Sequence, residues 1–458
     1  MSRVVTLAVL AALFAPAARA DLKLPEVRRL TLDNGAVVLL IPHREVPMIA
    51  FEAVLRGGSV LDPAGKEGLA GFTAAMVRKG ARGQTAEQLA DLVDGHGASL
   101  SLSVDEDATW VGLELLARDA ATGVDLLADL LMRPDFLPEE VEKLRARTAD
   151  GIRAAKEEPR SVLSLYFASA LFGEHPYGRP GTGTETTVAT FTADDVRRFH
   201  EQHWGGDRLL LAVGGDFDVD AMEATLRSRF GGWRRAAPLP AVPAPTPVTG
   251  RRVVLIDSPG ATQTYFSMGN VGQPRAQPNR EPLDLVHVLF GGRFTSMLNT
   301  ALRIESGLTY GARLSRSESG SGGSVTMWSY TQVSHTAEAM DLALATLQRL
   351  HEQGIAAKDL ESGKAYTRGQ MPTTLETASQ VTEKVAELAF FGLPDDAVEG
   401  YLPRLAAVTV ESAREAIRTR MVRPDDLVIV MIGDAAQIRD VAARYGPVTE
   451  KKLMDPGF

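Results

Sequence analysis

The chain has 458 residues, of which 45% are hydrophobic and 23% are charged, with 42 glycines, 25 prolines and no cysteine. This is the composition of a folded protein with domains of roughly 100–200 residues, and it excludes disordered, collagen-like and disulfide-stapled chains. The formal net charge of −9 argues against a nucleic-acid-binding surface, which needs clustered lysine and arginine. Without cysteine, thiolate nucleophiles, zinc fingers and iron–sulfur clusters are also excluded.

Residues 1–20 are predicted to be a secretory signal peptide. Arg3 supplies a positive start, residues 4–15 are mostly apolar, and Ala18-Arg19-Ala20 provides a small-x-small cleavage site. A mitochondrial transit peptide, the alternative, would be amphipathic and rich in serine and arginine. The apolar run is too short to span a bilayer, and no cysteine at the cleavage site can take a lipid. We therefore expect an exported protein without a membrane span, located in the periplasm if the source is bacterial.

Residues 21–235 are predicted to form a first domain of strands and helices. Strands are predicted where apolar residues run or alternate, at residues 36–41, 49–55, 99–103 and 109–115. Helices are predicted at residues 68–78, 86–93, 120–132 and 138–156, and the last of them opens with a proline. Runs of strands followed by runs of helices indicate an α+β domain, with an antiparallel sheet packed against helices.

A Pro-rich segment, residues 236–250, divides the mature chain near its middle. Its five prolines cannot join a helix or a central strand, so it is predicted to be a semi-rigid linker. The flanking halves resemble each other: residues 211–216 match 429–434 at an offset of 218 (434 − 216), and residues 136–143 match 355–362 at an offset of 219 (355 − 136). Two matches at nearly one offset predict a tandem duplication, with the second α+β domain at residues 251–458.

Two segments carry a family resemblance. Residues 57–62 (GGSVLD), 68–76 (GLAGFTAAM) and Lys79-Gly80 resemble the signature segment of the M16 (insulinase/pitrilysin) peptidases, whose motif His-x-x-Glu-His stands in a Gly-Leu-Ala-His-Phe-Leu-Glu-His-Met context. Residues 290–303 and 305–310 are similar to the family's Leu-Arg-Glu-x-x-Gly-Leu-x-Tyr element, with Ile304 in place of its glutamate. The resemblance spans essentially the whole mature chain and implies two homologous M16-like domains of the M16B type.

The zinc motif of the family is degenerate in this chain. Two histidines at i and i+4 share a helix face and can bind one zinc ion, with a glutamate at i+3 as general base and a later carboxylate as third ligand. By resemblance, the first ligand position is Gly71, the base position is Ala74, the second ligand position is Ala75 and the third is Gly151. Asp150 is adjacent, but a lone carboxylate cannot hold the metal. We therefore expect no metal site, no cofactor and no zinc peptidase activity in this chain alone.

The C-terminal element is largely intact. In the family, the matching arginine and tyrosine act across the cleft from the zinc, so the resemblance implies substrate-binding roles for Arg303 and Tyr310. The planar guanidinium of Arg303 would hold a substrate carbonyl or carboxylate, and the hydroxyl of Tyr310 would donate to the developing oxyanion. The alternative interpretation is that Arg303 is a solvated helix residue and Tyr310 a packed strand aromatic.

The resemblance implies three functional hypotheses. The favoured one is a non-catalytic, substrate-binding subunit of a heterodimeric M16B zinc metallopeptidase, paired with a sister chain that carries His-x-x-Glu-His and the zinc. An unfolded peptide substrate would then add as a strand to a sheet edge. The second hypothesis is an inactive M16-like scaffold or peptide-binding protein, similar to the core subunits of the respiratory cytochrome bc1 complex. The third, a stand-alone hydrolase with another mechanism, has no motif in its support, since no Gly-x-Ser-x-Gly nucleophile sequence is present.

Three other motifs have structural interpretations. His200 and His203 are spaced as a potential metal pair, but we expect them to belong to a structural helix. His175 begins a His-Pro-Tyr-Gly sequence, which is expected to form a turn. Residues 320–323 (GSGG) are too short for a phosphate-binding loop and are predicted to be a mobile hairpin loop.

Overall fold

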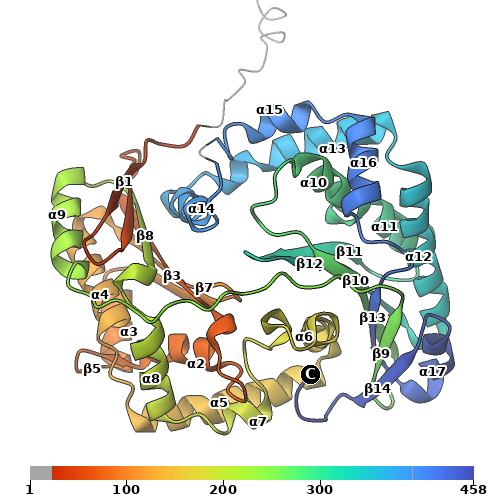
Figure 1. Cartoon of the computed structure of the whole chain (residues 1–458), viewed down its shortest axis with the longest axis horizontal. Coiled ribbons are helices and arrows are strands. Elements are labelled where there is room, and N and C mark those ends of the chain that lie inside the picture. Colours follow the sequence, from red (N-terminus) through yellow and green to blue (C-terminus); the bar gives the residue numbers. More distant parts are fainter. Residues whose placement is uncertain (1–22, 395) are drawn as a thin grey trace, which may run out of the picture.

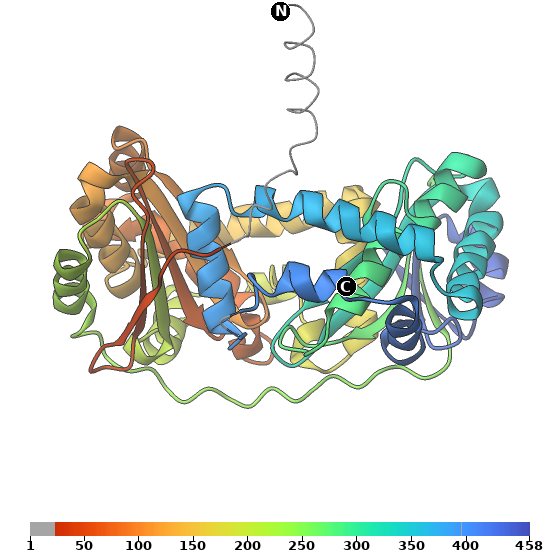
Figure 2. The ribbon, with the colours of Figure 1, turned by 90° about the horizontal axis from the view of Figure 1, so that it is seen from above.

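The computed structural model describes residues 23–394 and 396–458, so the predicted signal peptide lies outside the described residues. Two α+β halves lie side by side (Figure 1), as expected for this fold class. Residues 236–249 contain no helix or strand and run extended along one side of both halves (Figure 2). Among the described helices, none combines the length and the apolar character that crossing a bilayer requires.

The N-terminal half is built on a six-stranded sheet in the order β1-β2-β8-β3-β7-β6. The sheet is mixed rather than purely antiparallel, because β2 pairs with β8 in parallel. A parallel pair needs a long crossover connection, and the helices between these two strands supply it. The strands are β1 (Arg28–Thr31), β2 (Val37–Pro42), β3 (Met48–Arg56), β6 (Ser99–Val104), β7 (Ala108–Leu116) and β8 (Leu209–Gly215).

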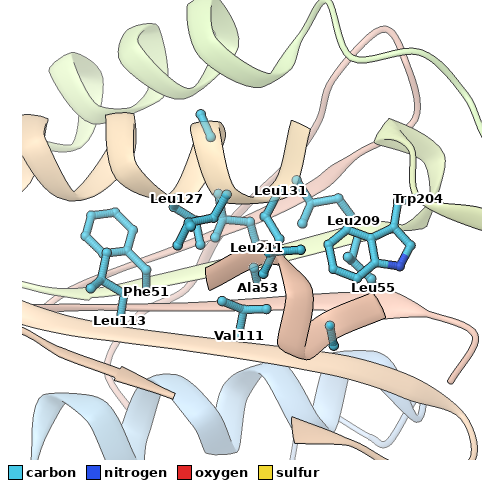
Figure 3. Packing of buried hydrophobic residues seen from close by; sticks show 14 of the residues in the cluster. Phe51, Ala53, Leu55, Val111, Leu113, Leu127, Leu131, Trp204, Leu209 and Leu211 are labelled. Atoms are coloured by element: carbon cyan, nitrogen blue, oxygen red, sulfur yellow. The ribbon is translucent and has the colours of Figure 1, made fainter. Parts of the chain in front are cut away.

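Helices cover the outer face of this sheet and enclose its core. Phe51, Leu113 and Leu211 point from the strands toward Leu127 and Leu131 of one helix (Figure 3), and all five are 0–2% exposed. Each of these strands alternates between a core-facing and an opposite face, which places its apolar residues on the helix side. The helices of this half are α2 (Leu69–Met76), α3 (Ala86–Gly95), α4 (Ala120–Met132), α5 (Pro138–Glu157), α6 (Pro159–Phe172), α7 (Glu185–Val188), α8 (Ala193–His203) and α9 (Val219–Phe230), with a small hairpin of β4 (Gly80–Ala81) and β5 (Gln84–Thr85).

The C-terminal half repeats the plan, with a sheet in the order β11-β12-β10-β13-β9-β14. Here β9 pairs in parallel with both β13 and β14, so this sheet is mixed as well. The strands are β9 (Arg252–Asp257), β10 (Gln263–Gly272), β11 (Ala312–Glu318), β12 (Gly323–Gln332), β13 (Val428–Gly433) and β14 (Val448–Lys452). The helices are α10 (Glu281–His287), α11 (Met297–Asn299), α12 (Thr336–Gln353), α13 (Ala357–Gln370), α14 (Ala378–Phe390), α15 (Tyr401–Ala406), α16 (Val410–Arg420) and α17 (Ala435–Ala443).

The two halves exchange one helix each. Helix α6 of the N-terminal half packs on β10 and β13 of the C-terminal sheet, and α14 of the C-terminal half packs on β3 and β8 of the N-terminal sheet (Figure 1). Each exchanged helix buries a separate apolar cluster, one around Phe167 and Val430 and the other around Phe390 and Leu210. Because each sheet needs an apolar cover on both faces, the halves are interlocked by their cores.

The exchanged helices are themselves equivalent in the duplication. Helix α6 begins at residue 159 and α14 at residue 378, an offset of 219 (378 − 159). Trp110 on β7 and Trp328 on β12 differ by 218 (328 − 110), and the two strands hold the same place in their sheets. The duplicated unit therefore includes the helix that it gives to the other half.

Candidate functional site

The helix that aligns with the zinc motif begins at a buried carboxylate. Asp62 accepts hydrogen bonds from the backbone N–H groups of Gly68 and Ala70, both at 2.7 Å, and this fixes the first turn of α2. Gly68 has a φ of 93°, a left-handed conformation that favours glycine. Burial raises the pKa of the Asp62 carboxyl to about 7, against the lowering effect of the two hydrogen bonds.

The aligned metal positions hold no side chain that fits a zinc ion. At Gly71, an added Cβ would lie 2.8 Å from the carbonyl oxygen of Gly181, so the backbone occupies the space that a histidine would need. Ala74 is buried and Ala75 half-buried, while Gly151 is exposed on α5. In the part of the chain that the structure describes, no three His, Asp or Glu side chains come together in a group that could hold a metal ion.

Arg303 and Tyr310 lie in the segment of the C-terminal half that leads into the edge strand β11. Arg303 belongs to the π-helical turn η7 (Thr300–Glu305), a rare geometry that occurs often at functional sites. Its guanidinium carbon lies 4.8 Å from the centre of the Phe294 ring, within the range of a cation–π contact. Tyr310 is 79% exposed and precedes β11 by two residues. It is therefore not a packed strand aromatic, and its hydroxyl is available to another molecule.

Two exposed apolar residues lie in the same region of the sequence. Phe294, which contacts Arg303, is 61% exposed, and Ile304 is 53% exposed. Thr309, between them and the strand, accepts a hydrogen bond from the backbone N–H of Gly311 at 3.1 Å and holds the turn. The sequence pointed to Arg303 and Tyr310 but not to Phe294, whose role depends on the fold bringing its ring under Arg303.

An edge strand of the N-terminal sheet faces a polar cavity between the halves. Strand β6 ends the sheet, and its exposed serines, Ser99, Ser101 and Ser103, line a cavity of about 550 Å³. Glu52 of β3 and Glu383 of α14 line the same cavity from the two different halves. Burial, and then the charge of Glu383, raise the pKa of the Glu52 carboxyl to about 8. A lone acid in the apolar run of residues 48–55 is the sequence signal that marks Glu52.

A set of polar contacts ties the two halves together around Tyr177. The Asp107 carboxylate accepts hydrogen bonds from the backbone N–H of Gly320 and from the Tyr177 hydroxyl, the latter at 3.0 Å. The backbone N–H of Ser321 donates to the Tyr177 hydroxyl at 3.1 Å. The predicted mobile loop at residues 320–323 is therefore docked, because the N-terminal half supplies acceptors for its free N–H groups.

The histidine motifs have structural roles. His175 accepts from the backbone N–H of Tyr177 at 3.1 Å, which fixes the expected turn, and its Nε2 lies 2.8 Å from the carbonyl oxygen of Pro243 in the linker. His200 is buried in α8 with its Nε2 2.8 Å from the carbonyl oxygen of Leu131. Burial lowers the pKa of His200 to about 4, so its imidazole is neutral at physiological pH.

Two protein-family models match the chain. The model described as insulinase (peptidase family M16) matches residues 39–185, and the one described as peptidase M16 inactive domain matches residues 190–366. Among curated relatives, an uncharacterized zinc protease of Mycobacterium tuberculosis is 26% identical over 396 residues, covering 85% of this chain and 90% of the relative. The uncharacterized zinc protease YmxG of Bacillus subtilis is 24% identical over 356 residues, covering 77% of this chain and 85% of that protein.

Solved structures share the fold. A peptidase M16 inactive domain from Pseudomonas fluorescens superposes with a TM-score of 0.84 at 22% sequence identity, covering 89% of this chain and 98% of that chain. The first half of the periplasmic protease PqqL from Escherichia coli superposes with a TM-score of 0.72 at 17% identity, covering 93% of this chain and 98% of that chain. The complete arrangement of both halves is thus found in other proteins.

Proposed function

Because the chain belongs to the M16 peptidase family, we propose that it is the non-catalytic, substrate-binding subunit of a two-chain zinc metallopeptidase. The observation that carries the proposal is a contrast within one chain. The aligned zinc positions Gly71, Ala74 and Ala75 have no ligating side chain, while Arg303 is half-buried and Tyr310 is exposed in the segment that leads into β11. In this proposal the partner is an M16B sister chain with His-x-x-Glu-His, which holds the zinc and supplies the general base.

The C-terminal pair would act on the substrate across the interface. Arg303 is held over Phe294 and presents its remaining guanidinium donors to a substrate carbonyl or carboxylate. The exposed hydroxyl of Tyr310 donates a hydrogen bond to the oxygen that gains negative charge during peptide-bond cleavage. Neither role requires a metal ion in this chain, and its aligned zinc positions carry no metal-binding side chain.

The substrate in this proposal is an unfolded peptide bound by backbone pairing. Strands β6 and β11 each end their sheet, so each offers one row of free backbone N–H and C=O groups. Backbone pairing is compatible with many peptide sequences, because the hydrogen bonds involve only main-chain groups. Side-chain specificity comes only from pockets next to the added strand. We further propose that the chain is exported by residues 1–20 and meets its partner in the periplasm.

A second function, an inactive M16-like scaffold or peptide-binding protein, is favoured by a different observation. The Gly181 carbonyl oxygen lies 2.8 Å from where a Cβ at position 71 would be, so the N-terminal half leaves no room there for a metal-binding side chain. A scaffold would bind partners without needing a hydroxyl at position 310.

The experiment that separates the two is purification of the mature chain from a native envelope extract, with mass spectrometry of the proteins that co-elute. A near-equimolar exported chain with His-x-x-Glu-His supports the peptidase subunit. Recovery of the chain alone, or with unrelated membrane complexes, contradicts it and favours the scaffold. The same pull-down with Tyr310→Phe is the matched control, because this variant should retain the partner.

A further inference from the structure

We propose that the N-terminal half binds the C-terminal residue of a peptide, an apolar side chain with its free carboxylate, in a pocket beside the lost zinc position. The pocket has a volume of about 430 Å³ and lies between α2, α3, α4, α5 and β6. Ten of its twelve lining residues are alanine, valine or leucine, and the other two are Arg78 and Lys79. Ala75, at the aligned second zinc-ligand position, forms part of the wall.

The apolar wall selects an apolar side chain. Leu89 of α3 and Leu130 of α4 form buried wall positions, at 4% and 0% exposure. Leu100 and Leu102 reach the same pocket from the core-facing side of β6 and are only half-buried. An apolar side chain that fills the pocket would remove these apolar surfaces from water, which favours binding.

The two cations select a carboxylate. Arg78 and Lys79 lie in the turn η2 (Val77–Lys79) directly after α2, and within residues 23–394 and 396–458 neither forms an ion pair or a side-chain hydrogen bond. The neighbouring Arg82 differs, because it pairs with Asp129. No acidic residue lines the pocket. Two cations at an apolar pocket without an acid complement a negative charge on an apolar ligand.

The adjacent edge strand favours a peptide over a free fatty acid. Strand β6 supplies Leu100 and Leu102 to the pocket and also has an unpaired backbone edge, so a peptide paired with β6 could end with its last side chain in the pocket. This inference rests on the peptide binding of the proposed function, but it requires neither a partner chain nor zinc.

The test is calorimetric titration of the mature chain alone with acetyl-Ser-Ala-Leu as the free acid, with the same peptide as its C-terminal amide, and with octanoate. We expect the free acid to bind at least about tenfold more tightly than the amide, a difference of about 1.4 kcal/mol. Equal binding of acid and amide, no binding of the acid at millimolar concentration, or tighter binding of octanoate would each overturn the proposal.

Variants assign the binding to this pocket. Arg78→Gln with Lys79→Gln should weaken the free acid about tenfold, and Ala90→Leu, which extends a side chain into the pocket, should weaken acid and amide alike. Arg82→Gln is the matched control, since Arg82 is close in sequence but does not line the pocket. An equal loss in the control would show general charge attraction and overturn the assignment. A failed search for a zinc partner leaves this result unaffected, because the titration uses one chain.

Discussion

The two halves share a sheet order and an exchanged helix, but they differ where a function would be placed. In the N-terminal half the positions aligned with the metal ligands are glycine and alanine, and the carbonyl oxygen of Gly181 lies where a side chain at position 71 would begin. In the C-terminal half, a half-buried Arg303 and an exposed Tyr310 precede the edge strand β11. The two halves therefore share a fold, whereas only the C-terminal half has polar side chains at the positions aligned with functional residues.

The inner faces of the two sheets are both hollowed, and they differ in the residues that line them. The pairs Val54–Trp110 and Ser267–Trp328 are equivalent in the two sheets, so Glu52 opposite Gly112 corresponds to Tyr265 opposite Tyr330, whose rings stack at 5.5 Å. Glu52 and Gly112 line the cavity of about 550 Å³ under α14. The equivalent face under α6 lines a cavity of about 510 Å³ with Ser267 and Trp328. Each sheet therefore lines a cavity, and the cavity of the N-terminal sheet is the one that contains Glu52.

The largest effect is expected from an attempt to restore the zinc motif. Gly71→His with Ala74→Glu and Ala75→His should destabilise the chain by about 3–5 kcal/mol, because an imidazole at position 71 meets the Gly181 carbonyl and Ala74 is a buried core position. Zinc content by elemental analysis and the free energy of unfolding by denaturation would check this. A stable variant with one bound zinc ion would contradict this, because it would show that the backbone of the N-terminal half can still accommodate a metal site.

Tyr310→Phe should remove most of the activity of a reconstituted pair. Loss of one oxyanion donor lowers turnover by about 10²–10³-fold, while the phenyl ring that remains at this exposed position should leave pairing unchanged. Turnover of a quenched peptide and the affinity of the two chains are the measurements. Tyr330→Phe, in the stacked pair of the same half, is the control. Full activity of Tyr310→Phe would remove the functional distinction between the halves.

Glu52→Gln should stabilise the chain in a pH-dependent way. The pKa of Glu52 is raised to about 8 from its ordinary 4.5, so the folded state resists ionisation and loses stability as the pH rises from about 5 to 8. The glutamine cannot ionise, and we expect a gain of roughly 1–3 kcal/mol at pH 9 and almost none at pH 4.5. Urea denaturation at both pH values checks this, and a gain equal at both would contradict it.

The smallest effects are expected at the exchanged helices. Arg160 of α6 lies 5.2 Å from the ring centre of Trp328, and Arg56 of β3 lies 5.0 Å from that of Phe390 of α14. Replacing either arginine with glutamine should cost about 0.5–1 kcal/mol in the free energy of unfolding. Similar losses for the two variants would show that cation–π contacts stabilise α6 and α14 on their sheets to the same extent. A loss in only one variant would show that the two halves differ in this contact as well.

The sequence predicts the local structure of the N-terminal half well. The helix predicted at residues 120–132 is α4 itself, and the strand predicted at residues 109–115 lies within β7. Such elements follow from a regular spacing of apolar residues, which any sequence displays directly. The duplication is visible for the same reason, since two segments recur at offsets of 218 and 219 residues.

What the sequence does not predict is decided by distant contacts. The apolar residues of 159–172 have the same pattern whether that helix covers its own sheet or, as observed, the sheet of the other half. The parallel pairing of β2 with β8 also depends on strand order and not on the strands themselves. At the site, the exposure of Tyr310 and the contact of Phe294 with Arg303 arise only after the chain has folded around them.

The exchange of helices also sets the order in which the chain can fold. The face of the first sheet that carries Leu39, Ile41 and Val54 is covered by α14, and Arg56 donates to the carbonyl oxygen of Phe390, 334 residues further along. Contacts of such separation form late, because a long loop must close first. The first half of the protein therefore exposes this apolar face until α14 has been synthesised and has docked. Until then, aggregation through the exposed face competes with folding.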